Sequence, residues 1–389
     1  MQSQKQSERL TWFKEARFGL FFHWGTYAVY GRGAHAFRLE YTSLDEYKKN
    51  SNSFKPKQGW ADEWMQLVKH SGGKYAVLTT KHHEGYCLFE TKSTDYSAPK
   101  TGPGRDLVME FVAAARRAGI KIGFYFTPWD WRFGWQKILD SKNAKFEEYR
   151  KCMHTQIKEL CTHYGPIDLW WWDGRPPDTR KVIRWMRKVQ PNMIINDRCG
   201  LKLDCATSEK EIRRPAYSSP AWEVCMTSNK HWAYYADEKT CQWMSLADSI
   251  HWLVGIVSNG GNFLYNIGPK ANGDIPTRAR KLFEAIGDWL KNNGESIYDC
   301  GGSSITGGSC GATTARGNTT YLHVLHYIYP DVVILSPKVK VQSARILLTG
   351  KRLKVMQTGE RVIITGLPKK PPDVNDTIIL LKTGKSSEL

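Results

Sequence analysis

The chain has 389 residues, of which 41% are hydrophobic and 24% are charged, as in globular proteins of two domains, or of one large domain with an appendage. Its 56 Lys and Arg against 38 Asp and Glu give a net charge of +18. The basic residues are spread along the chain, without a long block and without a helix-turn-helix or RNP-type motif, so nothing in the pattern supports nucleic-acid binding.

The cysteines and the hydropathy pattern bear on the compartment. None of the nine Cys forms a C-x-x-C pair, which argues against a zinc ribbon or a thioredoxin-type motif and is typical of free thiols in a reducing compartment. The N-terminal segment has no apolar core of a signal peptide, and no run of about 18 apolar residues occurs. We therefore expect no membrane association, and either a cytoplasmic location or secretion with a signal peptide absent from this sequence.

Short apolar runs alternate with amphipathic stretches through the first three quarters of the chain. The runs that predict strands are 18–24, 75–81, 120–126, 167–172, 193–196, 222–226 and 262–266. The helical patterns are 60–71, 105–118, 142–163, 178–189, 245–257 and 277–292. Strands that are apolar throughout and separated by helices indicate a parallel sheet covered by helices. The number of units favours a (β/α)-barrel over an open doubly wound sheet, and both common nucleotide-binding motifs are missing.

The composition and the pattern of the sequence change after Asn293-Gly294. A Gly/Ser/Thr-rich stretch over 301–319 is followed by short β-rich runs at 320–328, 331–336, 343–349, 361–365 and 377–382. Short strands at turn-punctuated intervals indicate a small antiparallel domain, and we predict a sandwich. The expected organisation is a barrel over residues 1–297 followed by a C-terminal β-sandwich over residues 298–389.

Polar and aromatic side chains gather at the predicted C-terminal ends of the barrel strands, the ends that carry the active site in barrels of this type. In chain order they are His23-Trp24, Lys81-His82-His83-Glu84, Tyr125 with Trp129-Asp130-Trp131, Asp173 and Asn196-Asp197-Arg198, and the strand predicted over 222–226 itself carries Trp222-Glu223. The strand bodies before them are apolar. We therefore expect these side chains to share one polar pocket.

Two kinds of site fit such a pocket. His23, His82, His83 and Asp173 could bind a metal ion, but adjacent strand residues point to opposite faces, and the chain has no H-x-H or H-E-x-x-H motif. The other kind is a carbohydrate site, in which polar side chains bind hydroxyl groups, aromatic rings stack on the sugar, and two carboxylates break the glycosidic bond. We favour the carbohydrate site.

Seven stretches carry a resemblance to a known family. They are FGLFFHWG, KYAVLTTKHHEGYCLFETKSTDY, RDLVMEFVAAARRAGIKIGFYF, LWWWDG, INDR, WEVC and GGNFLYNIGP. In this order, over about residues 15–295, they resemble the α-L-fucosidases of glycoside hydrolase family 29. The resemblance implies a (β/α)8-like TIM barrel, regular or irregular, followed by a β-sandwich. It also implies removal of terminal α-linked L-fucose with retention, without a metal or another cofactor.

The same resemblance implies roles for individual residues. Asp173 matches the nucleophile, and Glu223 in Trp-Glu-Val-Cys is the best match to the general acid/base, with Glu40, Asp204, Glu209 and Glu211 as fallbacks. The implied fucose contacts are His23, Glu40, His82, His83, Tyr125, Arg198 and Trp232. Three departures concern fine specificity: Tyr41 stands where the family often has Trp, Glu84 where it often has Asp, and Ala233 where it often has Gly.

The sequence thus predicts a retaining exo-α-L-fucosidase that hydrolyses terminal α-linked L-fucose of oligosaccharides or glycoconjugates through a covalent fucosyl-enzyme intermediate. The expected partner is a fucosylated glycan, with no nucleic acid and no membrane, and a homo-oligomer is left open. Two alternatives remain: another TIM-barrel hydrolase, including a metal-assisted one, and a non-catalytic fucose-binding protein.

Overall fold

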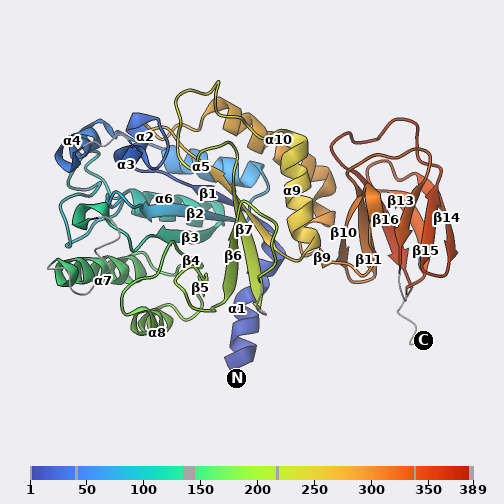
Figure 1. The fold of residues 1–389 in the computed structure, drawn as a ribbon, viewed down its shortest axis with the longest axis horizontal. Coiled ribbons are helices and arrows are strands. Elements are labelled where there is room, and N and C mark those ends of the chain that lie inside the picture. Colours follow the sequence, from blue (N-terminus) through green and yellow to red (C-terminus); the bar gives the residue numbers. More distant parts are fainter. Residues whose placement is uncertain (1, 40–42, 135–144, 216–218, 337–338, 385–389) are drawn as a thin grey trace.

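Two sheets organise the chain, and they lie side by side along the long axis of the molecule (Figure 1). The computed structural model describes residues 2–39, 43–134, 145–215, 219–336 and 339–384. The first sheet is a parallel barrel wrapped by helices, and the second is an antiparallel sheet near the C-terminus. The predicted fold class, a TIM-like barrel followed by a sandwich, is confirmed.

Eight parallel strands form the barrel. They are β1 (Phe18–Phe22), β2 (Tyr75–Lys81), β3 (Lys121–Phe126), β4 (Leu169–Trp172), β5 (Ile194–Ile195), β6 (Cys205–Glu209), β7 (Ala221–Thr227) and β8 (Asn262–Ile267). The strand order is β5-β4-β3-β2-β1-β8-β7-β6, so β5 and β6 are the two edges. An isolated bridge between Asn196 and Cys205 joins these edges, which makes the barrel nearly closed and irregular.

Most helices of the barrel lie where the sequence predicts them. They are α5 (Trp60–His70), α6 (Leu107–Ala118), α7 (Phe146–His163), α8 (Thr179–Val189), α9 (Leu246–Ser258) and α10 (Thr277–Asn293), with short helices α2 (Tyr27–Tyr30), α3 (Ala36–Leu39) and α4 (Leu44–Lys49) after β1. Helix α6 shows the local causes clearly. The Asp106 carboxylate caps its first turn by accepting a bond from the Met109 amide, and Gly119 ends it at φ 70°.

Two elements differ from the prediction. Helix α1 (Gln2–Ala16) was not predicted, and its apolar residues Leu10 and Phe13 pack among the residues that fill the barrel interior. The stretch 204–212, which lies outside the predicted strands, contains strand β6. Its sequence, CATSE, has no apolar run, so the strand forms through its parallel pairing with β7 rather than through a propensity that the sequence displays.

The C-terminal sheet consists of β9 (Gly301–Gly302), β10 (Gly311–Arg316), β11 (Thr319–Val324), β12 (Val332–Leu335), β13 (Val341–Ile346), β14 (Arg352–Thr358), β15 (Arg361–Thr365) and β16 (Thr377–Thr383). It curls over a core of its own, and a bridge between Thr306 and Leu335 helps to bring its ends together. Its other face adds Tyr321, Ile378 and Leu380 to the main core of the barrel. The domain division at 297/298 falls between the 3-10 turn Gly294–Ser296 and β9, and as a division it stays a prediction.

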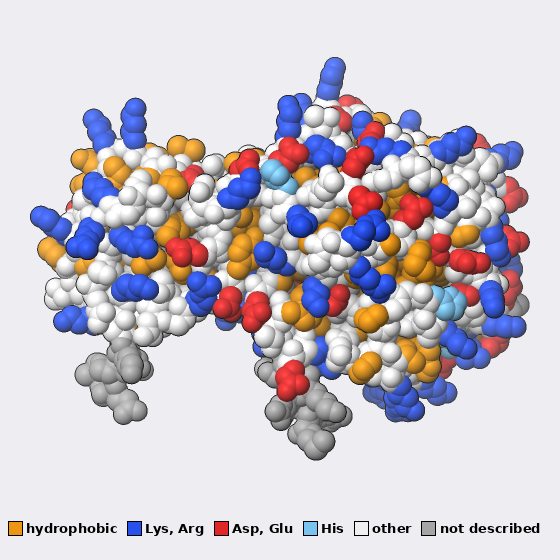
Figure 2. All heavy atoms as spheres, turned by 180° about the vertical axis from the view of Figure 1, so that it is seen from behind, with side chains coloured by type: hydrophobic (Ala, Val, Ile, Leu, Met, Phe, Trp, Pro, Cys, Tyr) orange, Lys and Arg blue, Asp and Glu red, His pale blue; other side chains and the backbone are white. Residues whose placement is uncertain are grey.

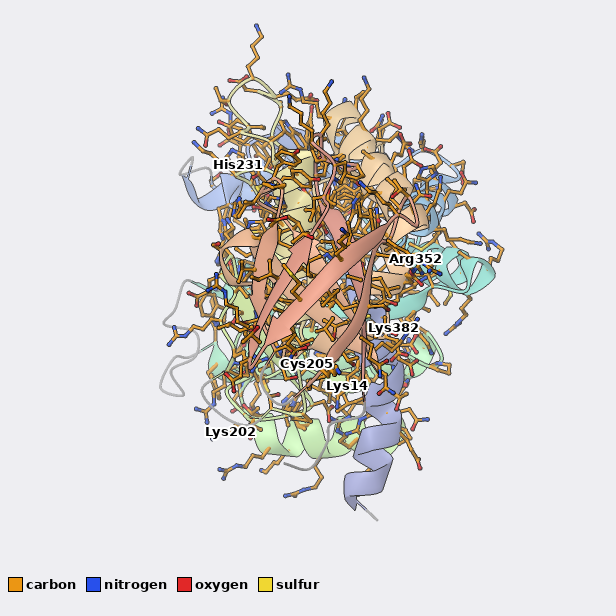
Figure 3. The ribbon with its side chains drawn as sticks, turned by 90° about the vertical axis from the view of Figure 1, so that its right-hand side faces the viewer. Lys14, Lys202, Cys205, His231, Arg352 and Lys382 are labelled. Atoms are coloured by element: carbon orange, nitrogen blue, oxygen red, sulfur yellow. The ribbon has the colours of Figure 1, made fainter. Side chains whose placement is uncertain are left out.

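The surface shows how the positive charge is distributed. Lys and Arg side chains are scattered over both parts of the molecule on the face drawn in Figure 2, among acidic and apolar side chains. In the sheet face seen in Figure 3, Arg352 and Lys382 lie on strands of the C-terminal domain. No described helix has the length and apolar character needed to cross a membrane.

A buried ion cluster ties the open edges of the barrel to α1. The Asp204 carboxylate, 2% exposed, accepts a 2.6 Å bond from Arg9 of α1 and a bond from Arg187 of α8. It also accepts a 2.9 Å bond from the Ile195 amide of β5. One carboxylate therefore holds α1, α8 and both edge strands together. Because its carboxylate binds two arginines and a backbone amide, Asp204 has a structural role and does not fit that of a proton donor.

We expect Asp204→Ala to lower the free energy of unfolding by about 3 kcal/mol, because it leaves two arginines without their buried counter-charge. The control is Asp62→Ala, which removes an equally short but exposed ion pair with Arg117 and should cost less than about 1 kcal/mol. Urea denaturation of both variants measures the difference. Equal losses would contradict the structural role given to Asp204.

Candidate active site

The structure brings the predicted strand-end residues together at the C-terminal end of the barrel. His23 follows β1, His82 and His83 follow β2, and Tyr125 lies near the end of β3. Asp173 directly follows β4, and Arg198 follows β5. Trp232 lies in the loop after β7, where its ring is 4.9 Å from that of His23. Seven of the nine predicted residues thus form one cluster of neighbouring side chains, and the space that they border is called the pocket below.

Asp173 is the centre of this pocket. Its Oδ1 accepts a 2.8 Å bond from Arg198, and its Oδ2 accepts a 2.6 Å bond from the Tyr125 hydroxyl, with His83 Nε2 at 3.5 Å. Burial alone would raise the pKa of Asp173, but the Arg198 cation, His83 and the Tyr125 hydroxyl outweigh it and lower that pKa to about 2. Asp173 is therefore an ionised carboxylate at neutral pH, as a nucleophile must be.

Three buried histidines line the pocket beside Asp173. Burial, together with the neighbouring imidazole of His82, holds the pKa of His23 and of His83 well below the ordinary value, and burial lowers the pKa of His82 to about 3. All three rings are therefore neutral near pH 7, with one donor and one acceptor nitrogen each. His23 Nδ1 lies 2.6 Å from the Asn266 side-chain oxygen, which orients its ring. Neutral, oriented imidazoles suit the hydroxyl groups of a sugar.

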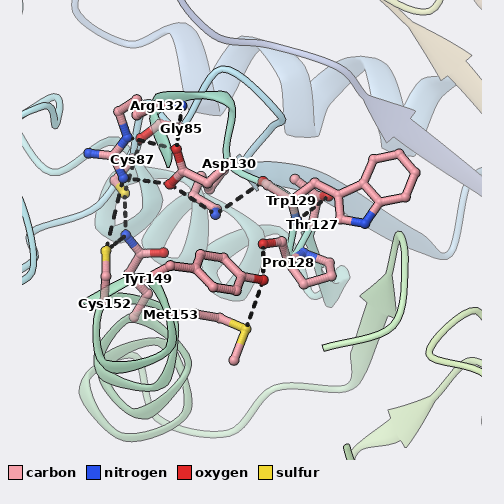
Figure 4. Close-up of polar contacts among 12 residues, drawn as sticks. Gly85, Cys87, Thr127, Pro128, Trp129, Asp130, Arg132, Tyr149, Cys152 and Met153 are labelled. Atoms are coloured by element: carbon pink, nitrogen blue, oxygen red, sulfur yellow. Dashed lines mark hydrogen bonds and ion pairs between the residues drawn. The ribbon is translucent and has the colours of Figure 1, made fainter. Parts of the chain in front are cut away.

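The loop after β3 supports the pocket from outside (Figure 4). Arg132 binds both carboxylate oxygens of Asp130, and the Tyr149 hydroxyl donates a 2.7 Å bond to the Pro128 carbonyl. The Thr127 hydroxyl in this loop donates to the Asp173 backbone oxygen and lies 3.0 Å from His83 Nδ1. The loop thereby fixes the backbone of Asp173 and the ring of His83 together.

Gly85 is required where this loop meets the end of β2. It has φ 83°, and a Cβ at this position would lie 2.4 Å from both the Arg132 Nε and an Asp130 oxygen. Only glycine combines that conformation with so close an approach. This glycine was part of the motif that the sequence displays after the two histidines.

Glu223 occupies a different level of the barrel. It is 1% exposed and points into the interior, where its Oε2 accepts a 2.6 Å bond from the Tyr75 hydroxyl and its Oε1 a 3.0 Å bond from the Trp171 indole. Burial raises its pKa to about 7. Tyr75 begins β2, so Glu223 lies toward the N-terminal end of the barrel, beneath the Trp171 ring. Among the described residues its hydrogen bonds go to Tyr75 and Trp171 rather than to Asp173 or Arg198, and the acid/base role of Glu223 stays a prediction.

Glu209, one of the fallback acids, lies at the pocket itself. It ends β6, is 38% exposed, and accepts a 2.8 Å bond from Arg198, the same guanidinium that binds Asp173. The two carboxylates thus flank one arginine. A cavity of about 490 Å³ adjoins Glu209 and includes Asp197, Thr207, Arg213 and Trp222 in its wall. Of the other fallbacks, Asp204 is structural and Glu211 lies on the surface beside Arg213.

His35 was not predicted at the pocket, Glu84 was expected there without an assigned contact, and one predicted residue cannot be placed. The His35 ring lies 5.9 Å from the rings of both His82 and His83, at the pocket, on the long connection after β1. Glu84 lies behind His82, with its Oε2 3.5 Å from His82 Nδ1, and burial raises its pKa to about 8. No sequence pattern marks His35, whereas Glu84 adjoins the two motif histidines. Glu40 lies outside the described residues.

Among those described, no three His, Cys, Asp or Glu side chains form a group that could hold a metal ion.

A TIM-like barrel that presents an ionised carboxylate, a second carboxyl group and neutral histidines at its C-terminal end defines a glycoside hydrolase. The family model for alpha-L-fucosidases matches residues 1–295, and the chain belongs to this family, glycoside hydrolase family 29. It is an alpha-L-fucosidase by family.

Proteins of this family match nearly the whole length of the chain in sequence and in fold. The tissue alpha-L-fucosidase of Rattus norvegicus is 30% identical, over 93% of this chain and 86% of the rat protein. The solved alpha-L-fucosidase isoenzyme 1 of Paenibacillus thiaminolyticus superposes with a TM-score of 0.90 at 32% identity, covering 98% of this chain and 100% of that one. A Bacteroides thetaiotaomicron enzyme of the family, solved as a trapped covalent intermediate, has a TM-score of 0.87 at 27% identity, with 97% and 96% coverage.

We expect Arg198→Gln to move the acid limb of the kcat/KM profile to higher pH. Arg198 is the strongest of the groups that lower the pKa of Asp173, and raising that pKa leaves the carboxylate protonated over more of the acidic range. Tyr125→Phe, which removes a weaker contribution, should shift the limb less. Profiles measured on an aryl fucoside for both variants and the parent test the order. Acid limbs that coincide would contradict it.

Proposed function

We propose that the chain is a retaining exo-α-L-fucosidase that releases terminal α-linked L-fucose from oligosaccharides or glycoconjugates. The observation that carries the proposal is Asp173, an ionised carboxylate held by Arg198 and Tyr125 beside three buried neutral histidines. His23, His82 and His83 are each at most 6% exposed, which supports a closed pocket for a single terminal sugar unit. The partner is then a fucosylated glycan.

The chemistry follows from the placement of the carboxylates. Asp173 attacks the anomeric carbon and forms a covalent fucosyl-enzyme, while an acid protonates the leaving oxygen. The same group, now a base, takes a proton from water as that water attacks the anomeric carbon and releases fucose. Retention requires the two carboxyl groups to lie about 5–5.5 Å apart. Two carboxylates that bind the two ends of one guanidinium, as Asp173 and Glu209 do, are compatible with this short separation.

Glu209 fits the acid/base role better than Glu223. An acid/base must reach the leaving group and then a water molecule, and Glu209 is partly exposed and adjoins the cavity next to the pocket. Both Glu223 oxygens are engaged by Tyr75 and Trp171 inside the barrel. We therefore assign Asp173 as the nucleophile and Glu209 as the acid/base. The contacts proposed for fucose are His23, His82, His83, Tyr125, Arg198 and Trp232, with Glu40 retained from the sequence.

The nucleophile is tested with Asp173→Gly. We expect kcat/KM on an aryl α-L-fucoside to fall by about ten-thousand-fold or more, because no covalent intermediate can form. Exo action is checked in the same assay series with oligosaccharides whose fucose is either terminal or substituted by a further sugar; only the first should release fucose. Near-parental activity of Asp173→Gly would refute the assignment, and binding of fucose without turnover by the parent would favour a non-catalytic protein.

The two candidate acids are separated by azide. We expect Glu209→Ala to lose about 100- to 10,000-fold in turnover of a substrate with a poor leaving group and to produce fucosyl azide when azide is added. Azide replaces the water that the missing base would activate. Glu223→Ala should give no azide product, because shortening a side chain inside the barrel creates no space for azide beside the anomeric carbon. The opposite pattern would return the acid/base role to Glu223.

A further inference from the structure

Glu223 is a buried carboxyl group that the proposed chemistry does not use. It lies in the third position of β7, inside the barrel, and its two oxygens accept one hydrogen bond each, from Tyr75 and from Trp171. Taking a carboxyl group out of water has a large unfavourable free energy. A core of well-packed apolar residues would be at least as stable at this position. The contacts of Trp171 indicate what Glu223 does.

Trp171 packs against the two residues that bind the proposed nucleophile. Its ring stacks on that of Tyr125 at 5.5 Å with an interplanar angle of 21°, and the Arg198 guanidinium lies 5.0 Å from its centre. Tyr125 and Arg198 are the two residues that bind the Asp173 oxygens, at 2.6 and 2.8 Å. Trp171 also shares the inner face of β4 with Asp173, two residues further on. A rotation of this indole would displace both hydrogen-bond donors of Asp173 together.

We propose that Glu223 is a positioning residue that locks the Trp171 ring and thereby holds Tyr125 and Arg198 in place around Asp173. The indole N–H is the one polar group of the Trp171 side chain, and the bond to Glu223 fixes the rotation of the ring about its side-chain torsions. Glu223 reaches the reaction through Trp171 and does not touch substrate. The inference rests on the proposed function, because it assigns Asp173 as the nucleophile.

What this position must supply to Trp171 is an acceptor. The indole N–H can only donate, whereas the Tyr75 hydroxyl can donate or accept. Glu223→Gln can therefore keep both hydrogen bonds, with its amide oxygen on Trp171 and its NH2 group on the Tyr75 oxygen. Glu223→Met has a similar shape but no acceptor oxygen, so it removes the bond to Trp171. Glu223→Met is therefore the informative substitution, Glu223→Gln is its conservative control, and the Tyr75 bond provides a matched control on the other oxygen.

The experiment compares Glu223→Met, Trp171→Phe, the double variant and the controls Glu223→Gln and Tyr75→Phe. We expect kcat to fall about 10- to 100-fold in the first two, as a small displacement of reacting groups does. Glu223→Gln, which keeps an acceptor for the Trp171 indole, should stay within a few-fold of the parent. The double variant should lose no more than the worse single variant, because both remove the same restraint. Tyr75→Phe should lower the melting temperature while keeping kcat within a few-fold of the parent. If Glu223→Met does not fold, the comparison of Trp171→Phe with Tyr75→Phe tests the same restraint.

The substrate distinguishes positioning from acid catalysis. A fucosyl fluoride has a leaving group that needs little protonation, so Glu209→Ala should still form the covalent intermediate rapidly, whereas Glu223→Met should form it slowly and gain nothing from azide. Parental activity in Glu223→Met, multiplied losses in the double variant, or azide rescue of Glu223→Met would overturn the inference. Absence of fucosidase activity in the parent would instead overturn the proposed function.

Discussion

The ion pair between Asp173 and Arg198 is the interaction on which the rest of the site depends. A nucleophilic carboxylate must stay ionised in a pocket closed enough to hold a sugar, and burial opposes that charge. Arg198 supplies the counter-charge at 2.8 Å, and the Tyr125 hydroxyl supplies a short hydrogen bond. The surrounding histidines are kept neutral by burial, so they offer hydrogen bonds to hydroxyl groups without placing further full charges in the pocket.

The aromatic run before Asp173 shows how the barrel provides rigidity for this pair. Trp170 and Trp172 face outward and are fully buried against the helices, whereas Trp171 faces the interior beneath Tyr125 and Arg198. Three large side chains in succession thus anchor the strand on both faces. The residue that follows them, Asp173, is held at the end of a strand that cannot easily shift, which suits the nucleophile role proposed for it.

Much of the architecture and of the pocket was predictable because periodicity and strand-end position carry the information. The apolar runs indicated seven of the eight barrel strands, and the residues after them include Asp173, the histidines and Arg198. The eighth strand, β6, was missed because its sequence has no apolar run, and Glu209, which lies on it, was predicted only as a fallback acid. Glu223 was preferred from its motif, and its acid/base role stays a prediction. A sequence motif does not show whether a strand residue lies at the pocket or deeper in the barrel, because that depends on the stagger of neighbouring strands.

The weakest part of the barrel is also where the two carboxylates meet. Strands β5 and β6 are the edges of the sheet, and Arg198 and Glu209 lie on opposite sides of the seam between them. A regular hydrogen-bond ladder between β5 and β6 would fix the spacing of these two strands. In the described structure the isolated bridge between Asn196 and Cys205 joins them instead, and the buried Asp204 cluster holds them at the end away from the pocket. The separation of Asp173 from Glu209 is therefore set by side-chain contacts through Arg198 more than by strand pairing. In the proposed mechanism, the arginine that binds both carboxylates sets the distance between them on which retention depends.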